Sequence, residues 1–341
     1  MSPTMVPPQL CVGVDIAAAT LTAAWSRADG SVSTPRTYAQ DPHGFASLQT
    51  HLTTPAIPPQ DILVVLEATG SYWIALAVTL HAAGYRVSVI NPLQAHHFAK
   101  AQLRRAKSDA LDAQDLARLA ATLHPPLWEP PPAIYHEVRQ RLLVRDGLVT
   151  MRQQARNQRH ALTQWPVVVA GVEAQLTAVI ADLDRRIDTL EGEIATALAA
   201  SEWAASLGYL TSAPGIGLLT AAWLLVATVN FTIGETPEAV VAYAGLAPVP
   251  RQSGTSIRGG AQIGHSGNER LRTAVYLATL SAARFNPMIR GFYQRLRAAG
   301  KPVKVARCAA ARKLLHLAWA LVTKRQAFDP HRHAPPAPIA A

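Results

Sequence analysis

Two stretches decide how the first part of this chain folds: Leu10-Cys-Val-Gly-Val-Asp-Ile16 and Ile62-Leu-Val-Val-Leu-Glu67. Short apolar runs of this kind are typical of strands that are buried on both faces. Each run ends in a carboxylate at the point where its strand emerges from the core. Asp15 and Glu67 are therefore the first candidate site residues.

The elements expected around these two runs follow an α/β order. Strands are expected at residues 11–16, 21–26, 32–38, 62–66 and 86–90, and helices at 45–52, 72–83 and 95–123. Three strands, a helix, a strand, a helix, a strand and a helix form the element order of the ribonuclease H-like (RuvC-like) fold. We expect an α/β domain with a mixed sheet over residues 8–125, although this order is not unique to one fold.

A proline-rich segment, His124-Pro-Pro-Leu-Trp-Glu-Pro-Pro-Pro132, ends this region because proline continues neither a helix nor a central strand. We expect a linker and two long helices over residues 126–203. In the second helix the apolar positions step by four and three residues, as in a coiled-coil seam or on one face of a bundle helix. These positions are Leu176, Ile180, Leu183, Ile187, Leu190 and Ile194. Either arrangement requires a partner helix.

The C-terminal part is expected to be mainly α-helical over residues 204–325. Its last helix is rich in Ala and Arg and runs from about residue 303 to 324. Residues 326–341 have little apolar surface to bury, so we expect a disordered tail.

Charge is unevenly distributed along the chain. The net charge of the 341 residues is +10, and 49% of them are hydrophobic, enough to give two domains their own cores. Residues 1–130 hold 8 Lys or Arg and 9 Asp or Glu, whereas residues 201–341 hold 16 and 5, a net of +11. The basic C-terminal part indicates a polyanionic partner such as nucleic acid, although a solvated basic face would have the same composition.

Two cysteines almost 300 positions apart, Cys11 and Cys308, do not form the disulfide framework of a small secreted domain. The first ten residues carry no Lys or Arg, so a signal peptide is not expected. The most apolar run, residues 218–229, is too short to cross a bilayer. We expect a cytoplasmic protein that does not associate with a membrane.

Four carboxylates are expected to meet in the first domain. Asp109 and Asp112 are spaced i, i+3 and project from one face of a helix. If this helix packs across the strands that carry Asp15 and Glu67, the four acids converge and a divalent cation must offset their repulsion. Oxygen ligands of this kind suit Mg²⁺ or Mn²⁺, and two such ions support phosphodiester chemistry. Asp115 is expected at the surface or in support of the other acids.

These blocks resemble the DEDD recombinases of bacterial insertion sequences, specifically the insertion-sequence-110 family, which includes the bridge-RNA-guided recombinases. The matching blocks are VGVDI, LEATGSYW and INPLQAHHFAKAQLRRAKSDALDAQDLARLA, followed by SAPGIGLLTA, AYAGLAPVPRQSG, IGHSGNERLRTAVYLA and GKPVKVARCAAARKLLHLAWA. The resemblance covers residues 10–325. One departure is the Ile-Ala-Ala-Ala after Asp15, where relatives often have Ser-Lys.

The resemblance implies a RuvC-like nuclease domain, a coiled-coil linker and a transposase domain with a nucleophilic serine. Asp15, Glu67, Asp109 and Asp112 would hold Mg²⁺, while the serine attacks DNA and forms a transient phosphoserine link. It also implies a noncoding guide RNA that pairs with donor and target DNA, and a dimer that assembles into a tetramer. Ser253, in Pro-Arg-Gln-Ser-Gly, is the expected nucleophile, with Ser256 and Ser266 as alternatives.

The Pro214-Gly-Ile-Gly217 segment before an apolar helix is similar to the hairpin of helix-hairpin-helix modules, whose backbone N–H groups bind a phosphate. A helix start fixed by proline and glycine would look the same. The two glycines of this segment and a set of basic and polar residues in the C-terminal part are expected to contact nucleic acid or to stabilise charge at the serine. The set is Gly215, Gly217, Arg251, Arg258, Asn268, Arg270, Arg272, Lys301, Lys304, Arg307, Arg312 and Lys313.

The resemblance therefore implies a DNA transposase or recombinase that excises and inserts its own mobile element with a guide RNA. Two alternatives stay open at this stage. One is a metal-dependent hydrolytic nuclease of the junction-resolvase type, in which water attacks and Ser253 is structural. The other is a nucleic-acid-binding scaffold without enzymatic activity.

Overall fold

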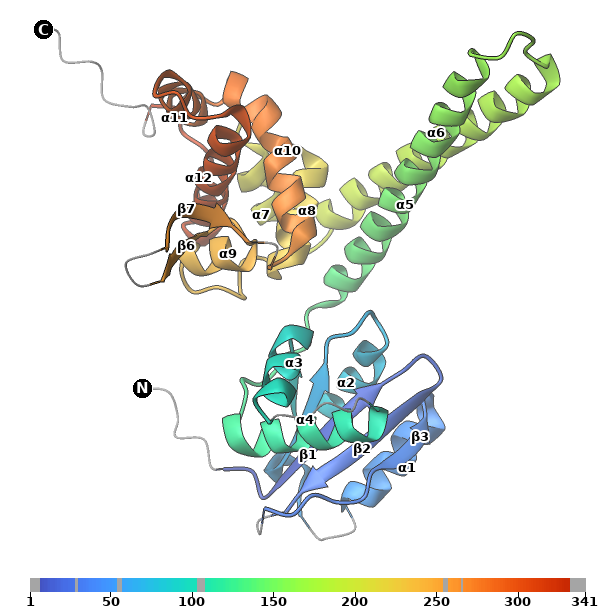
Figure 1. Ribbon diagram of the computed structural model, residues 1–341, viewed down its shortest axis with the longest axis vertical. Helices are drawn as coiled ribbons and strands as arrows, with labels where there is room; N and C mark the ends of the chain where they lie inside the picture. Colours follow the sequence, from blue (N-terminus) through green and yellow to red (C-terminus); the bar gives the residue numbers. More distant parts are fainter. Residues whose placement is uncertain are drawn as a thin grey trace, which may run out of the picture. The chain divides into compact units, whose positions relative to one another are not determined.

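The structure is a computed structural model that describes residues 7–27, 30–53, 57–102, 108–253, 257–264 and 266–331 (Figure 1). The chain divides into two compact units, residues 1–130 and residues 131–341.

The N-terminal unit is a five-stranded mixed sheet between two layers of helices. Its strands are β1 (Leu10–Ile16), β2 (Thr20–Ser26), β3 (Arg36–Ala39), β4 (Ile62–Glu67) and β5 (Arg86–Ile90). Its helices are α1 (Pro42–Thr53), the 3-10 turn η1 (Pro59–Asp61), α2 (Trp73–Ala82), α3 (Pro92–Ala101) and α4 (Asp109–Leu123). The strand order is β3-β2-β1-β4-β5, with β1, β4 and β5 parallel and β2 antiparallel to both of its neighbours. The predicted α/β class and mixed sheet are confirmed.

Alternation along β1 separates the two layers. Val12 and Val14 are fully buried in one core with α1 and α2. Cys11 faces the other side and packs in a core with α4. Successive side chains of a strand point to opposite faces, so residues 11, 13 and 15 all face α4. This face carries the candidate site.

Two elements differ from the sequence-based prediction. The strand expected at 32–38 begins only at Arg36, after a single bridge between Ser26 and Val32. Pro35 has no N–H to donate to a ladder, which accounts for the late start. The helix expected at 95–123 is two helices, because Ser108 is extended and its hydroxyl accepts from the Leu111 amide as the N-cap of α4.

The C-terminal unit begins with two long paired helices, α5 (Ala133–Leu162) and α6 (Ala170–Ala199). The predicted apolar seam of α6 is buried at Ile180, Leu183, Ile187 and Ile194. Ion pairs join the two helices, including Arg145 to Glu191 at 2.7 Å. The partner helix that the seam requires is thus α5 of the same chain.

The described residues of this unit also form six further helices and a hairpin. They are α7 (Ala204–Thr211), α8 (Leu218–Thr228), α9 (Pro237–Tyr243), β6 (Pro248–Ser253), β7 (Ile257–Ile263), α10 (Glu269–Phe285), α11 (Pro287–Ala298) and α12 (Val303–Thr323). The core centres on α12, whose Leu314, Leu315 and Ala318 are almost fully buried. The predicted helical character is confirmed, but the antiparallel hairpin β6–β7 was not predicted.

The end of the described chain is attached to this core. The backbone N–H of Phe328 donates to the Ser212 hydroxyl at 2.8 Å, and the Phe328 ring packs on the core. The rest of the predicted tail, residues 332–341, lies outside the described residues. Across the described ranges, no helix has both the length and the hydropathy of a membrane span.

Candidate active site

Asp15 and Glu67 lie side by side where two parallel strands end. Val14 of β1 pairs with Leu66 of β4, and the next residue of each strand is one of the two acids. Val65 packs in the core that contains α4, so Glu67, two residues further on, projects to the same face. Asp15 projects to that face too, and both carboxylates therefore lie on the α4 side of the sheet.

Gly13 allows α4 to pack directly on β1. A Cβ at this position would fall on backbone atoms of Ala113 and Ala117 and within 2.6 Å of the carbonyl carbon of Leu116. Only glycine permits this approach of a helix backbone to a strand. Because Asp15 is the next residue on this face, the contact at Gly13 sets the distance between β1 and the start of α4.

The first turn of α4 carries the other two acids. Asp109 and Asp112 follow the Ser108 N-cap and lie on one side of the helix. Carboxylates in a first turn are favoured by the positive end of the helix dipole. The helix dipole therefore stabilises these two carboxylates even before a cation binds.

The other three acids lie close enough to Asp15 for their charges to affect its ionisation. We call Asp15, Glu67, Asp109 and Asp112 the acidic cluster. The pKa of Asp15 rises from 3.8 to about 6, first because burial disfavours the charged form. The negative charges of Asp112, Asp109 and Glu67 raise it further, in that order, and the backbone N–H of Ile16 opposes them. The structure thus brings together the four carboxylates that the sequence singles out.

The chemistry of the acidic cluster fits a hard divalent cation. Its donors are all carboxylate oxygens, which Mg²⁺ and Mn²⁺ prefer, and a cation would relieve the repulsion at Asp15. Within the part of the chain that the structure describes, no three His, Cys, Asp or Glu side chains already stand in position to hold a metal ion. Side chains of the cluster would therefore have to turn toward an ion to bind it.

Two residues neighbour the acidic cluster, and the sequence singles out only the second of them, Asp115. The Thr69 hydroxyl donates to a Glu67 carboxylate oxygen at 2.6 Å and so orients it. Asp115 is 7% exposed, and its carboxylate pairs with Arg118 at 3.0 Å. Asp115 is thus not a surface acid. It lies one turn after Asp112, within the packed face of α4.

The predicted nucleophile lies in the hairpin. Ser253 is the last residue of β6 and pairs with Ile257 of β7. Ser266 precedes α10, and its carbonyl accepts from the Arg272 guanidinium at 3.1 Å. Outside the described residues lie Ser256 and the side chains of Arg251, Ser253 and Arg258.

The Pro-Gly-Ile-Gly turn joins α7 to α8 and packs against α10. Gly215 has φ +100°, and a Cβ there would lie 2.6 Å from Ala282 Cα. The Asn286 amide donates to the Pro214 carbonyl at 3.3 Å and holds the turn. Gly217 precedes α8, and a Cβ added there would meet no atom within 4 Å. Packing alone therefore accounts for Gly215, and phosphate binding at this turn stays a prediction.

Asn268 and Arg272 have partners within the protein. Asn268 caps α10 by accepting from the Leu271 amide, and its own amide donates to the Tyr243 hydroxyl at 3.0 Å. Arg272 also donates to the Ala244 carbonyl at 3.3 Å. These bonds fasten the end of α9 to the start of α10, so the two residues have a structural role whether or not they contact nucleic acid.

Arg270 is half-exposed and is also engaged. It pairs with Asp146 of α5 at 2.8 Å and stacks over the Trp223 ring at 5.2 Å. Together these contacts bring α5, α8 and α10 side by side.

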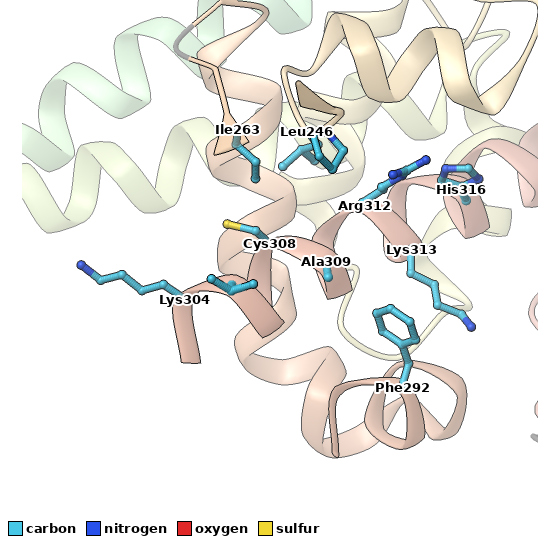
Figure 2. A pocket seen from close by; sticks show the side chains of 11 residues that line it. Leu246, Ile263, Phe292, Lys304, Cys308, Ala309, Arg312, Lys313 and His316 are labelled. Carbon is cyan, nitrogen blue, oxygen red and sulfur yellow. The ribbon is translucent and has the colours of Figure 1, made fainter. Parts of the chain in front are cut away.

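The basic residues of the last helix separate into two groups. Lys301 is exposed just before α12, and Arg307 lines a hollow beside Phe285. Lys304, Arg312 and Lys313 line a different cavity, of about 800 Å³ (Figure 2). Of the predicted nucleic-acid contacts, these three form the one compact group of cations around a cavity within the described residues.

Comparisons with known proteins agree with this arrangement in both units. A family model of the IS110 DEDD transposases matches residues 12–164, and the model of the transposase IS116/IS110/IS902 family matches residues 208–294. The first range includes the whole acidic cluster, and the second includes the β6–β7 hairpin.

Several relatives match over long stretches. The pilin gene-inverting protein of Moraxella lacunata is 30% identical over 301 residues, 87% of this chain and 91% of the relative. Its counterpart in Moraxella bovis is 31% identical over the same shares. An uncharacterized 43.6 kDa protein of insertion element IS110 from Streptomyces coelicolor is 36% identical over 156 residues, 46% of this chain and 36% of the relative.

Each of the two units matches a transposase family model, so the chain is a transposase, an enzyme that acts on DNA. The chain belongs to the IS110 family of transposases. Transposases of the DEDD type generally depend on divalent metal, in agreement with the carboxylate donors of the acidic cluster.

Proposed function

We propose that this transposase cleaves and rejoins DNA strands with the acidic cluster as its cation site and Ser253 as its nucleophile. The observation that carries the proposal is the convergence of four carboxylates around Asp15, whose pKa rises to about 6 through its burial first and then through the negative charges of the other three. Repulsion of this kind is costly unless a cation offsets it. The β3-β2-β1-β4-β5 order supports a ribonuclease H-like assignment for this unit.

In this proposal the residues of the cluster have separate tasks. Asp15 and Glu67 supply ligand oxygens from the rigid strands, and Asp109 and Asp112 supply them from the first turn of α4. Thr69 keeps the Glu67 carboxylate oriented through its hydrogen bond. A bound Mg²⁺ or Mn²⁺ would stabilise the negative charge that develops on the phosphate during strand exchange.

The serine provides the covalent step. The Ser253 hydroxyl gives up its proton as its oxygen bonds to phosphorus. The bond between phosphorus and the bridging oxygen of the strand breaks, and that oxygen takes up a proton to become the hydroxyl group of the cleaved strand. A strand hydroxyl then attacks the phosphoserine and releases Ser253, so that the number of phosphodiester bonds is conserved. Arg251 and Arg258, on the same hairpin, would stabilise the charge on the phosphate.

Rejoining distinguishes a recombinase from a hydrolytic nuclease. The Moraxella relatives are named for inverting a pilin gene, and inversion requires both cleavage and rejoining. We propose the same for this chain, with a noncoding guide RNA that selects donor and target DNA by base pairing. Assembly is proposed to be a dimer that forms a tetramer.

A denaturing-gel assay tests the proposal. The protein is incubated with Mg²⁺, the transcribed flanking RNA of its own element, and labelled donor and target DNA. Wild type is compared with Ser253→Ala and Asp15→Asn. The controls are Ser281→Ala, at an exposed position of α10, and Glu129→Gln, at an exposed position of the N-terminal unit.

The expected result is a covalent protein–DNA adduct in wild type and both controls, and none in Ser253→Ala or Asp15→Asn. Cleavage without an adduct, unchanged in Ser253→Ala, would instead identify a hydrolytic nuclease. Binding without cleavage, unchanged in Asp15→Asn, would identify a scaffold. An adduct that forms equally well without the RNA would refute RNA guidance alone.

A further inference from the structure

The cavity of about 800 Å³ beside α12 combines apolar side chains with three cationic ones (Figure 2). It lies between one face of α12, residue Phe292 of α11 and the base of the β6–β7 hairpin. Its volume is within the range of pockets that hold small organic ligands, about 300–1,000 Å³. We refer to it as the α12 pocket.

The centre of the α12 pocket is apolar. Leu246 and Ile263 form one wall, and Figure 2 shows Cys308 and Ala309 of α12 opposite them. The Phe292 ring lies at the end of the pocket where Lys313 is found. An aromatic ring and aliphatic walls offer stacking and van der Waals contact to a flat ring.

Cations surround this apolar centre. Lys304 lies at one end, and Arg312 and Lys313 lie toward the other (Figure 2). The Lys313 ammonium sits 4.8 Å from the centre of the Phe292 ring. Burial lowers the pKa of Lys313, and the nearby charge of Arg295 lowers it further. Arg295 does not line the pocket, but it lies 5.3 Å from the centre of the same Phe292 ring.

Few carboxylates oppose these cations. Among the residues that the structure describes, neither Lys304, Arg312 nor Lys313 forms an ion pair with a carboxylate. The carboxylate of Glu238, on α9, lies 3.9 Å from a ring nitrogen of His316, which lines the pocket. An anion bound at the rim would therefore meet attraction from the cations and little competition from the protein.

The position of the pocket connects it to the hairpin of Ser253. Pro248, at the start of β6, and Ile263, at the end of β7, both line it. Ser253 is five residues further along β6, which is about 17 Å at the rise of a strand. A nucleic-acid strand that reaches Ser253 can extend over this distance with a few nucleotides.

We propose that the α12 pocket binds one unstacked nucleotide of a DNA or RNA strand, with its base against Phe292 and the apolar walls and its phosphate at the Arg312 and Lys313 end. This rests on the proposed function in one respect, namely that the strand is cleaved and rejoined at the Ser253 hairpin. An apolar segment of a second copy is the competing occupant. It would not use the cations of the rim.

Binding of short single strands to the full-length protein tests the proposal. The probes are one DNA and one RNA oligonucleotide, each also made with a single abasic position moved along the strand. The pocket variants are Ala309→Leu, which fills the cavity, Phe292→Leu, which removes the ring but keeps an apolar side chain, and Arg312→Gln. Arg290→Gln, at an exposed position of α11 outside the pocket, is the control for lost charge.

Wild type is expected to bind a strand about tenfold more weakly when one particular base is missing, as for loss of one stacked base. Ala309→Leu and Phe292→Leu should each abolish this preference, and Arg290→Gln should retain it. Arg312→Gln should weaken binding of every strand more than Arg290→Gln does. The DNA and RNA series show which of the two strands supplies the nucleotide.

Equal affinity of wild type for intact and abasic strands would overturn the proposal. So would pocket variants that keep the base preference, or a change of oligomeric state in Ala309→Leu with nucleic-acid binding unaltered. The adduct assay for Ser253 is separate, so an active recombinase without base preference refutes this pocket alone.

Discussion

Replacing Asp15 with asparagine should stabilise the protein when no divalent cation is present. The Asp15 carboxyl is charged at neutral pH although burial and three neighbouring carboxylates disfavour its charge. Asparagine keeps the shape of the side chain and removes the charge. The substitution therefore relieves repulsion that the acidic cluster retains for function.

The size of the effect follows from the pKa. A rise from 3.8 to about 6 corresponds to about 3 kcal/mol at about 1.4 kcal/mol per pKa unit. Because the side chain is partly exposed, water screens part of this, and we expect a gain of about 1–2 kcal/mol. For a unit of this size the gain raises the unfolding midpoint by about 3–10 °C.

The gain should depend on pH in a defined direction. The folded state holds the Asp15 proton more tightly than the unfolded chain does. The charge of Asp15 therefore lowers the stability of wild type by nothing below pH 3.8 and by the full amount above about pH 6. The stability difference between Asp15→Asn and wild type should therefore be near zero at about pH 4. It should grow up to about pH 7 and then remain constant.

Differential scanning calorimetry in a chelator, over this pH range, measures the difference. Leu314→Ala, in the core of the C-terminal unit, identifies the transition of that unit, and Glu129→Gln controls for loss of an exposed acid. No gain in Asp15→Asn near neutral pH, or a gain that is the same at every pH, would refute the account of the acidic cluster.

Other substitutions test how the fold positions the sites. Gly13→Ala should lower the free energy of unfolding by about 3 kcal/mol, because its Cβ would meet the backbone of α4. Gly192→Ala, where a Cβ meets no atom within 4 Å, should be neutral or slightly stabilising, and equal unfolding midpoints of the two variants in calorimetry would contradict this. Ile187 is 2% exposed in the seam of α6, and Ile187→Ala should lower the stability of the C-terminal unit by about 2–4 kcal/mol. Val179 is 47% exposed on the same helix, and Val179→Ala should lower it by much less. Similar losses of stability in urea unfolding would argue against the α5–α6 pairing. Gly215→Ala should cost about 2–3 kcal/mol, since its φ is +100° and the backbone of α10 lies against it; an unchanged urea midpoint would show that the turn packs differently.

Much of the N-terminal unit could be predicted because its strands are continuous apolar runs. The acids after those runs, and the i, i+3 pair on α4, were sufficient to expect one cluster. Gly13 also carried a signal, since glycine inside a buried strand indicates a close backbone approach. Long-range packing brings α4 to the sheet face that carries Asp15 and Glu67. The spacing of residues along the chain does not predict that packing.

The hairpin and the α12 pocket could not be predicted in the same way. The β6 and β7 segments are rich in proline, glycine and polar residues, so neither has the apolar alternation of a half-buried strand. The pocket depends on residues from α11, α12 and both ends of the hairpin, which meet only in the folded chain. Asn268 and Arg272 look like phosphate ligands in the sequence, and only their partners reveal that they fasten α9 to α10.

The central claim is that the acidic cluster holds a divalent cation. Isothermal titration of the full chain with Mn²⁺, without nucleic acid, tests it most directly, with Asp15→Asn, Asp112→Asn and the control Glu129→Gln. We expect saturable binding in wild type and the control, and loss of at least about tenfold in affinity in each cluster variant. Binding should also raise the unfolding midpoint of wild type but not of Asp15→Asn. Equal Mn²⁺ affinity in all four proteins would contradict the claim.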